Sequence, residues 1–193
     1  MSGVVQTALF LYAGSIRPTA HGDCVDYISL DTIPHYTECS PLVAGLGYVL
    51  VELRVIPQHG VIRVLAVISH PAGENSIALI GINDCAKVHR ALLPRLEVVL
   101  NSQDIYMEVT SPGMERVIKN AAEFALFTGH LVRVWDSDVT DWIAGKIVVS
   151  DTESVTLEMI RTELVKGAEP SIGAPESKRI PYGRIAKAKL LQM

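Results

Sequence analysis

A turn near the middle of the chain, Ser111-Pro112-Gly113, separates two kinds of sequence pattern. Pro112 has no N–H to donate to a sheet, and Gly113 can take a positive φ at little cost, so these residues predict a tight turn. Before the turn, runs with a helical period alternate with runs of strand period. After it, short strand-like runs follow at roughly ten-residue spacing. The turn therefore predicts a joint between two domains rather than a hairpin or a catalytic loop.

The first half predicts an α+β domain over residues 36–110, in the order helix, strand, strand, helix, strand. A short helix is expected in "TECSPLVAGLGY", with Pro41 in its first turn. The runs "YVLVELRVIP" and "HGVIRVLAVIS" predict an antiparallel pair that turns at Gln58-His59-Gly60. A longer helix in "INDCAKVHRALLPRLEVVL" and a third strand in "IYMEVTS" complete the domain.

The longer helix carries the sharpest candidate for catalysis or metal binding. Asn83 or Asp84 can cap its start, and Pro94 is expected to kink or end it. Cys85 and His89 lie four residues apart and share a helix face, which suits half a zinc site or a thiol nucleophile. No neighbouring motif supplies further ligands or an orienting group, so packing of Cys85 in the core with His89 at its margin is the favoured interpretation. The sequence predicts a protein that is not an enzyme and needs no metal or cofactor.

The second half predicts an all-β domain over residues 115–193. The runs "GHLVRVWDS", "DWIAGKIVVSD", "SVTLEMI" and "KRIPYGRIAKAKLL" are typical of the short strands of a small barrel or sandwich. Lys166–Ser177 holds two prolines and two glycines and is expected to be a long mobile hairpin loop. Residues 1–35 show no sustained period and are expected to form a poorly packed N-terminal extension, and residues 111–114 are expected to form the hinge.

Composition narrows the functional classes. With 193 residues, 49% of them hydrophobic, the chain can bury real cores, and 20% of charged residues is too few for a polyionic arm. A net charge of −4 argues against sequence-independent nucleic-acid binding by the whole molecule, but it is compatible with a local basic patch. Cys24, Cys39 and Cys85 are odd in number and widely spaced, which favours a reducing compartment. No apolar run reaches the roughly 18–20 residues of a membrane span, so the sequence predicts a soluble cytoplasmic protein.

Six phrases of the chain, in order and spacing, resemble the ribosome maturation factor family RimP over about residues 36–193. They are "SPLVAGLGYVLVELRV", "GVIRVLAVIS", "INDCAKVHRAL", "YMEVTSPGMER", "AGKIVV…SVTLE" and "IPYGRIAKAKL". The resemblance implies an N-terminal α/β domain, a C-terminal SH3-like barrel, and a cytoplasmic protein that assists assembly of the small (30S) ribosomal subunit without catalysis. The implied partner is the immature subunit, through a ribosomal protein, its 16S rRNA or both, and the chain is expected to be a monomer. The alternative is a general RNA-binding module of the SH3-like or Sm-like kind, unrelated to ribosome assembly.

Charge placement predicts the surface that touches the subunit. From residue 178 to the end, the chain carries five positive charges and no acid. In the alternating run "IAKAKLL", two lysines point to one face, and a nearby tyrosine is expected to offer a stacking platform. An edge strand protected by lysines against aggregation accounts for this pattern nearly as well. The expected ribosome-binding residues are Lys178, Arg179, Tyr182, Arg184, Lys187 and Lys189.

The central turn is expected to set the angle between the two domains. The stretch shared with the family contains Glu108, Ser111, Pro112, Gly113 and Arg116. Glu108 and Arg116 flank the turn and are expected to form an ion pair that braces it. Residues 1–110 carry six basic and ten acidic residues, which suits either a docking surface for a basic ribosomal protein or an ordinary solvated surface.

Overall fold

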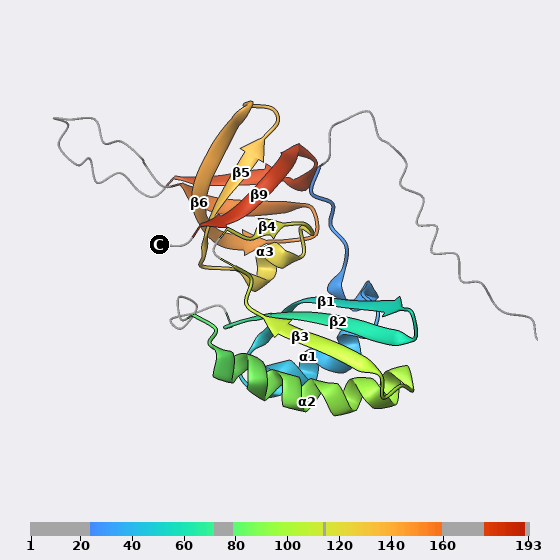
Figure 1. Cartoon of the computed structure of the whole chain (residues 1–193). Helices are drawn as coiled ribbons and strands as arrows, with labels where there is room; N and C mark the ends of the chain where they lie inside the picture. The colour runs from blue at the N-terminus through green and yellow to red at the C-terminus, as the bar shows by residue number, and fades with distance from the viewer. Residues whose placement is uncertain (1–23, 72–78, 114, 160–175, 192–193) are drawn as a thin grey trace, which may run out of the picture.

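The N-terminal half folds into a three-stranded sheet with two helices on one face. The computed structural model describes residues 24–71, 79–113, 115–159 and 176–191, so that most of the expected N-terminal extension lies outside the described part (Figure 1). The elements of this half are α1 (Tyr36–Gly45), β1 (Val49–Gln58), β2 (Val61–Ser69), α2 (Ile82–Leu100) and β3 (Ile105–Thr110). Their order is the predicted one, and the α+β class is confirmed.

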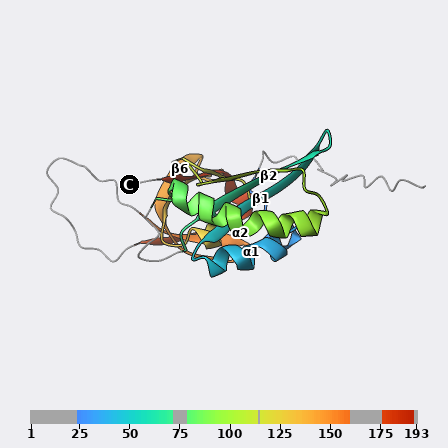
Figure 2. The ribbon, with the colours of Figure 1, turned by 60° about the horizontal axis from the view of Figure 1, so that its bottom comes forward.

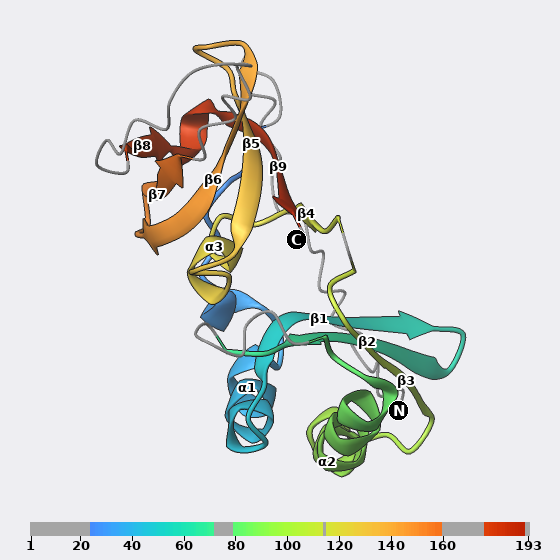
Figure 3. The same ribbon diagram turned by 90° about the vertical axis from the view of Figure 1, so that its left-hand side faces the viewer.

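The three strands lie in the order β1-β2-β3. β1 and β2 are antiparallel and turn through His59 and Gly60, whose φ values of 50° and 87° are those of a type I′ turn, the two-residue turn that matches the twist of a hairpin. β3 lies parallel to β2, because the intervening α2 carries the chain back to the start of the sheet. Figure 2 shows α1 and α2 side by side in front of the strands, and Figure 3 shows both helices beneath the sheet, so no described helix of this half lies on the opposite face.

The helices are held by apolar residues at helical spacing. Val88, Leu92 and Leu96 of α2 are fully buried against the sheet. Pro94 is expected to kink or end the helix; the expected end is wrong, since α2 continues through it to Leu100. Pro94 points to solvent and removes one hydrogen bond, while the buried leucines on either side keep the backbone helical. Pro41 likewise lies inside α1 and not in its first turn, because the helix starts earlier than predicted.

The C-terminal half is a six-stranded antiparallel sheet in the order β4-β9-β5-β6-β7-β8. Among the described residues the hydrogen-bonded order does not close, so the expected closed barrel is not seen, and β4 and β8 are the two edges. The expected loop Lys166–Ser177 connects β7 to β8 and lies almost entirely outside the described part. The elements of this half are β4 (Val117–Ile118), α3 (Glu123–Leu126), β5 (Leu131–Asp136), β6 (Asp141–Ser150), β7 (Ser154–Met159), β8 (Ser177–Pro181), the 3-10 turn η2 (Tyr182–Arg184) and β9 (Ile185–Leu191).

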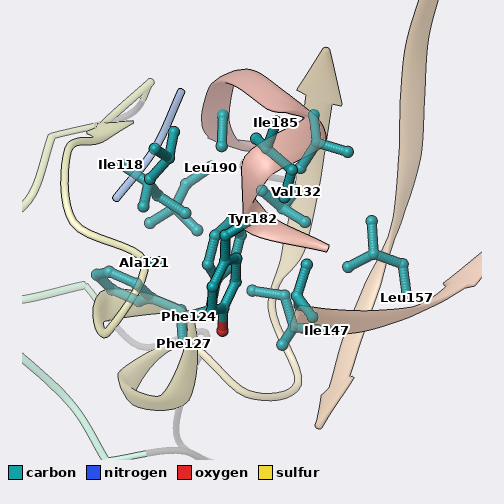
Figure 4. Packing of buried hydrophobic residues seen from close by; sticks show 14 of the residues in the cluster. Ile118, Ala121, Phe124, Phe127, Val132, Ile147, Leu157, Tyr182, Ile185 and Leu190 are labelled. Atoms are coloured by element: carbon teal, nitrogen blue, oxygen red, sulfur yellow. The ribbon is translucent and has the colours of Figure 1, made fainter. Parts of the chain in front are cut away.

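The six strands wrap around one apolar core. Phe124 and Phe127, from α3 and the turn after it, fill its centre and contact side chains from several strands (Figure 4). Val51 of β1 and Val67 of β2 also join this core, although they belong to the first sheet. The two halves therefore share apolar contacts at the end of the first sheet where β3 leads into β4 (Figure 3).

Residues 24–33, here called the N-terminal strap, join the two halves a second time. The Val25 amide donates to the Ile185 carbonyl at 2.9 Å. The backbone of Ile28 exchanges two hydrogen bonds, of 2.9 and 2.7 Å, with the side-chain amide of Asn120. From there the chain passes through the 3-10 turn η1 (Leu30–Thr32) into α1 of the first half (Figure 1). The expectation of a poorly packed extension is wrong for these residues.

Candidate functional site

The expected joint between the halves is built around Arg116 and not around an ion pair with Glu108. Gly113 takes a φ of +78°, as a tight turn requires. Arg116 Nη2 then lies 2.8 Å from Glu52 Oε2 of β1, and its Nε lies 2.8 Å from Glu123 Oε2 of α3. Glu108 is exposed on β3 and has no ion pair among the described residues. The predicted pairing of Glu108 with Arg116 is therefore wrong.

Glu52, Arg116 and Glu123, here called the Arg116 triad, form a buried charged cluster, with side chains 16%, 8% and 5% exposed. Burial alone would raise the pKa of Glu52, but the hydrogen bond from Arg116 and the neighbouring positive charges outweigh it and lower that pKa. Burial would lower the pKa of Arg116, and its two carboxylate partners outweigh that effect and raise it. The Arg116 triad thus ties β1, the linker and α3 together through two short charged contacts.

Three of the six expected ribosome-binding residues make ion pairs with Asp136 or Asp151 of the C-terminal half. Arg184 Nη2 and Lys178 Nζ lie 2.8 and 3.4 Å from Asp136 Oδ2, whose residue is fully buried. Burial opposes ionisation of Asp136, but these bonds outweigh it and lower its pKa. Arg179 Nη2 lies 2.9 Å from Asp151 Oδ2. These side chains hold the sheet together, and their charges are largely neutralised by it.

Tyr182 is the fourth expected residue, and it is not a surface platform. Only 4% of it is exposed, and its hydroxyl donates to the Asp151 carbonyl at 2.8 Å. Its ring stacks on Phe124 at 5.7 Å between centroids (Figure 4). It also stacks on Tyr27 of the strap at 6.2 Å. Burial raises its pKa to about 12. The prediction of a stacking role for Tyr182 is wrong, because η2 turns the ring inward.

Lys187 and Lys189, the remaining two, do share one face of β9, and the structure adds neighbours that the sequence interpretation missed. In register, Lys187 lies opposite Trp135 of β5, which lies opposite Trp142 of β6. Two residues before Trp135 on β5, and so on the same face, Arg133 lies opposite Lys189. With Lys146 of β6 these side chains form what we call the basic–aromatic face: Arg133, Trp135, Trp142, Lys146, Lys187 and Lys189. The alternation in "LVRVWD" could have placed Arg133 and Trp135 together, but it does not specify which strand lies next to β9.

The basic–aromatic face is preorganised by ring contacts. The Arg133 guanidinium carbon lies 5.0 Å from the centre of the Trp142 ring, and Trp135 meets that ring edge-on at 5.6 Å. Arg133 Nε is buried and has no hydrogen-bond partner among the described residues. Glu115 Oε2 lies 3.1 Å from Lys189 Nζ and 3.9 Å from Arg133 Nη2, whereas Lys187 has no ion pair among the residues described. A face with four cations and two indole rings has the chemistry to bind phosphates and to stack on exposed bases.

The described residues offer little for catalysis. They contain no group of three or more His, Cys, Asp or Glu side chains placed to hold a metal ion. Cys85 is only half-buried and not part of the core as expected, and Cys39 is the fully buried thiol. Burial raises the pKa of both thiols, that of Cys39 to about 11, so both are protonated at neutral pH. No described helix is long and apolar enough to cross a membrane.

Comparison with known families identifies the first half. Residues 38–115 match the model of the RimP N-terminal domain. The match covers α1 from its third residue, the three-stranded sheet, α2 and the central turn up to the residue before Arg116.

Proposed function

Since the match of its N-terminal half assigns the chain to the RimP family of ribosome maturation factors, we propose that the protein assists assembly of the small (30S) ribosomal subunit and catalyses no reaction. It acts in the cytoplasm as a monomer and binds the immature subunit. One observation carries the proposal beyond the family assignment. The basic–aromatic face concentrates cations and tryptophans on a protein whose net charge is −4, as expected of a local contact with rRNA.

The two halves are two domains, residues 36–110 and 115–193, joined at residues 111–114. Each domain contacts a different part of the subunit. The second domain is an SH3-like barrel that stays open between β4 and β8, and the common core of its six strands supports this assignment. It contacts rRNA through the basic–aromatic face. The first domain lies in the acidic part of the chain and contacts a basic ribosomal protein, since complementary charge raises the rate of encounter.

The joint fixes how the two contacting surfaces are presented. Pro112 and Gly113 make the turn, and the Arg116 triad and the strap hold the domains on either side of it. A pair of tethered surfaces gains avidity only when both can reach their targets at once. We therefore propose that the joint holds the two domains at a fixed angle and does not act as a freely moving hinge.

Cosedimentation of the purified protein with immature small subunits tests this function. The double variant Lys146→Ala/Lys187→Ala removes two exposed cations from the basic–aromatic face. We expect weaker association and a salt dependence shallower by about two at most on a log–log plot. The matched control, Arg90→Ala/Arg95→Ala, removes two exposed cations from α2 and should bind as the wild type does. Equal binding by both double variants would contradict the proposed contact.

The second candidate function is a general RNA-binding module of the SH3-like or Sm-like kind, which the same face would also serve. Sucrose-gradient fractionation of cell extract separates the two candidates. A small-subunit maturation factor should sediment with free small subunits, whereas a general module should follow messenger RNA. Recovery with messenger RNA alone would reject the assembly function.

A further inference from the structure

The open face of the three-stranded sheet carries a hollow next to its hairpin. Ile62, Ile105 and Met107 point toward α1 and α2 and pack in the core of this half. Because side chains alternate along a strand, Arg63 and Tyr106, which are paired in register, point to the opposite face. Both are exposed, Tyr106 by 60%. A large aromatic ring is therefore presented on the face opposite α1 and α2, near the hairpin end of the sheet.

The hairpin of β1 and β2 forms one side of the hollow next to the Tyr106 ring. The hollow has a volume of about 340 Å³ and is lined by Gln58, His59, Val61, Arg63 and Tyr106. The guanidinium carbon of Arg63 lies 5.7 Å from the centre of the Tyr106 ring, so a cation stands beside an aromatic surface. The positive φ values at His59 and at Gly60 fix the type I′ turn that carries part of this wall.

The chemical groups that line the hollow indicate which kind of ligand it can bind. An amide, an imidazole, a guanidinium and a phenol supply hydrogen bonds, and the ring and Val61 supply apolar contact. No carboxylate lines the hollow itself, and the acids nearest to Tyr106 in the chain, Asp104 and Glu108, each lie two residues away from it. A flat, polar-edged ring joined to a negative charge matches this set, since the base stacks on tyrosine while the phosphate meets arginine.

We propose that this hollow binds an unpaired nucleotide of single-stranded RNA, with its base stacked on Tyr106 and its phosphate on Arg63. The proposal rests on the proposed function, in which the partner contains rRNA, and adds a second RNA contact on the domain that the charge count assigns to protein. Gln58 and His59 meet the edge of the base. The site differs from the basic–aromatic face, which lies on the other sheet.

Fluorescence anisotropy of the full chain with labelled single-stranded RNA decamers tests the site. Tyr106→Ala should weaken binding about five- to hundredfold, the range of one lost base–aromatic stack, and Tyr106→Phe should bind as the wild type does. Arg63→Ala should weaken binding by several-fold, while Arg90→Ala, which removes an exposed cation from α2, should not. An abasic decamer keeps the phosphates without the bases, so Tyr106→Ala should bind it as tightly as the wild type does.

Tryptophan emission distinguishes RNA bound in the hollow from RNA bound at the basic–aromatic face. The chain has two tryptophans, and both lie on the basic–aromatic face, so RNA bound there quenches them and RNA bound in the hollow does not. Tyr106→Ala that binds the decamers at wild-type strength would overturn the proposal, as would the absence of any binding by the wild type. Lost association of Tyr106→Ala with small subunits, with unchanged decamer binding, would instead assign the hollow to a protein. If the gradients reject the assembly function and Tyr106 still governs decamer binding, the site stands without that function.

Discussion

Replacement of Arg116 by methionine should be among the most destabilising changes outside the apolar cores. Methionine keeps the length of the side chain and removes both charge-assisted hydrogen bonds, to Glu52 and Glu123. Each such bond contributes about 1.5–3 kcal/mol. Glu52 keeps its ion pair with Arg54, whose Nε lies 2.7 Å from Glu52 Oε1, and this limits the loss on that side. Glu123 is left as a carboxylate 5% exposed, so the free energy of unfolding should fall by about 3 kcal/mol, the low end for a broken buried pair.

The pH dependence of the free energy of unfolding provides a second test of the Arg116 triad. The pKa of Glu52 is lowered in the folded protein from its ordinary value of 4.5. Stabilisation from such a group is present above the unfolded pKa and is lost as the pH falls through the folded one. The difference between wild type and Arg116→Met should therefore be full at neutral pH and should shrink below about pH 4.5.

Urea unfolding followed by circular dichroism measures both quantities. The double variant Arg116→Met/Glu123→Gln removes the stranded carboxylate as well and should recover at least half of the lost stability, because a neutral amide is less costly to bury. A loss below about 1 kcal/mol for Arg116→Met, as for an exposed ion pair, would refute the reasoning. So would a double variant less stable than Arg116→Met alone.

Two glycines give further predictions. At Gly145 a β-carbon would lie 2.7 Å from the Glu158 carbonyl oxygen, so Gly145→Ala should force β6 from β7 and cost about 1–3 kcal/mol by urea titration of tryptophan emission. Gly183→Ala, where nothing lies within 4 Å, is the matched control and should be nearly neutral. Gly113→Val must hold a branched residue at a φ of +78°, so it should lower the free energy of unfolding by about 1 kcal/mol and weaken cosedimentation with small subunits. Gly113→Asn, whose side chain tolerates that conformation, should bind normally. Native binding by a folded Gly113→Val protein would show that the angle at the joint is unimportant.

The elements of the fold could be predicted because their signals are local. The alternation in β1 and β2, the spacing of Val88, Leu92 and Leu96, and the turn at His59-Gly60 each lie within a few residues of chain. The error at Pro94 has a tertiary cause. Pro94 is a helix breaker by intrinsic propensity, and the buried leucines of α2 override that propensity.

The candidate site was harder to predict because it depends on which strands become neighbours. Alternation assigned Lys187 correctly to one face of β9, but only the pairing of β9 with β5 places Trp135 beside it. Arg116 finds Glu52 across 64 residues of sequence, whereas the nearer Glu108 was the expected partner. Tyr182 lies in a 3-10 turn, where no two-residue period tells which way a ring points. Charges and rings of this kind are placed by tertiary contacts, which periodicity does not encode.

The N-terminal strap has a consequence for how the protein is made. Val25 leaves the ribosome early, yet its partner Ile185 belongs to the last strand, 160 residues later. At translation rates of about 5–20 residues per second, roughly ten to thirty seconds pass between the synthesis of Val25 and that of Ile185. The strap cannot dock during that interval. The first sheet and its helices can close their own core in that interval, because their contacts are local by comparison. Docking of the strap is then a late event of maturation, and a nascent chain halted before β9 would expose both the strap and the open core that it seals.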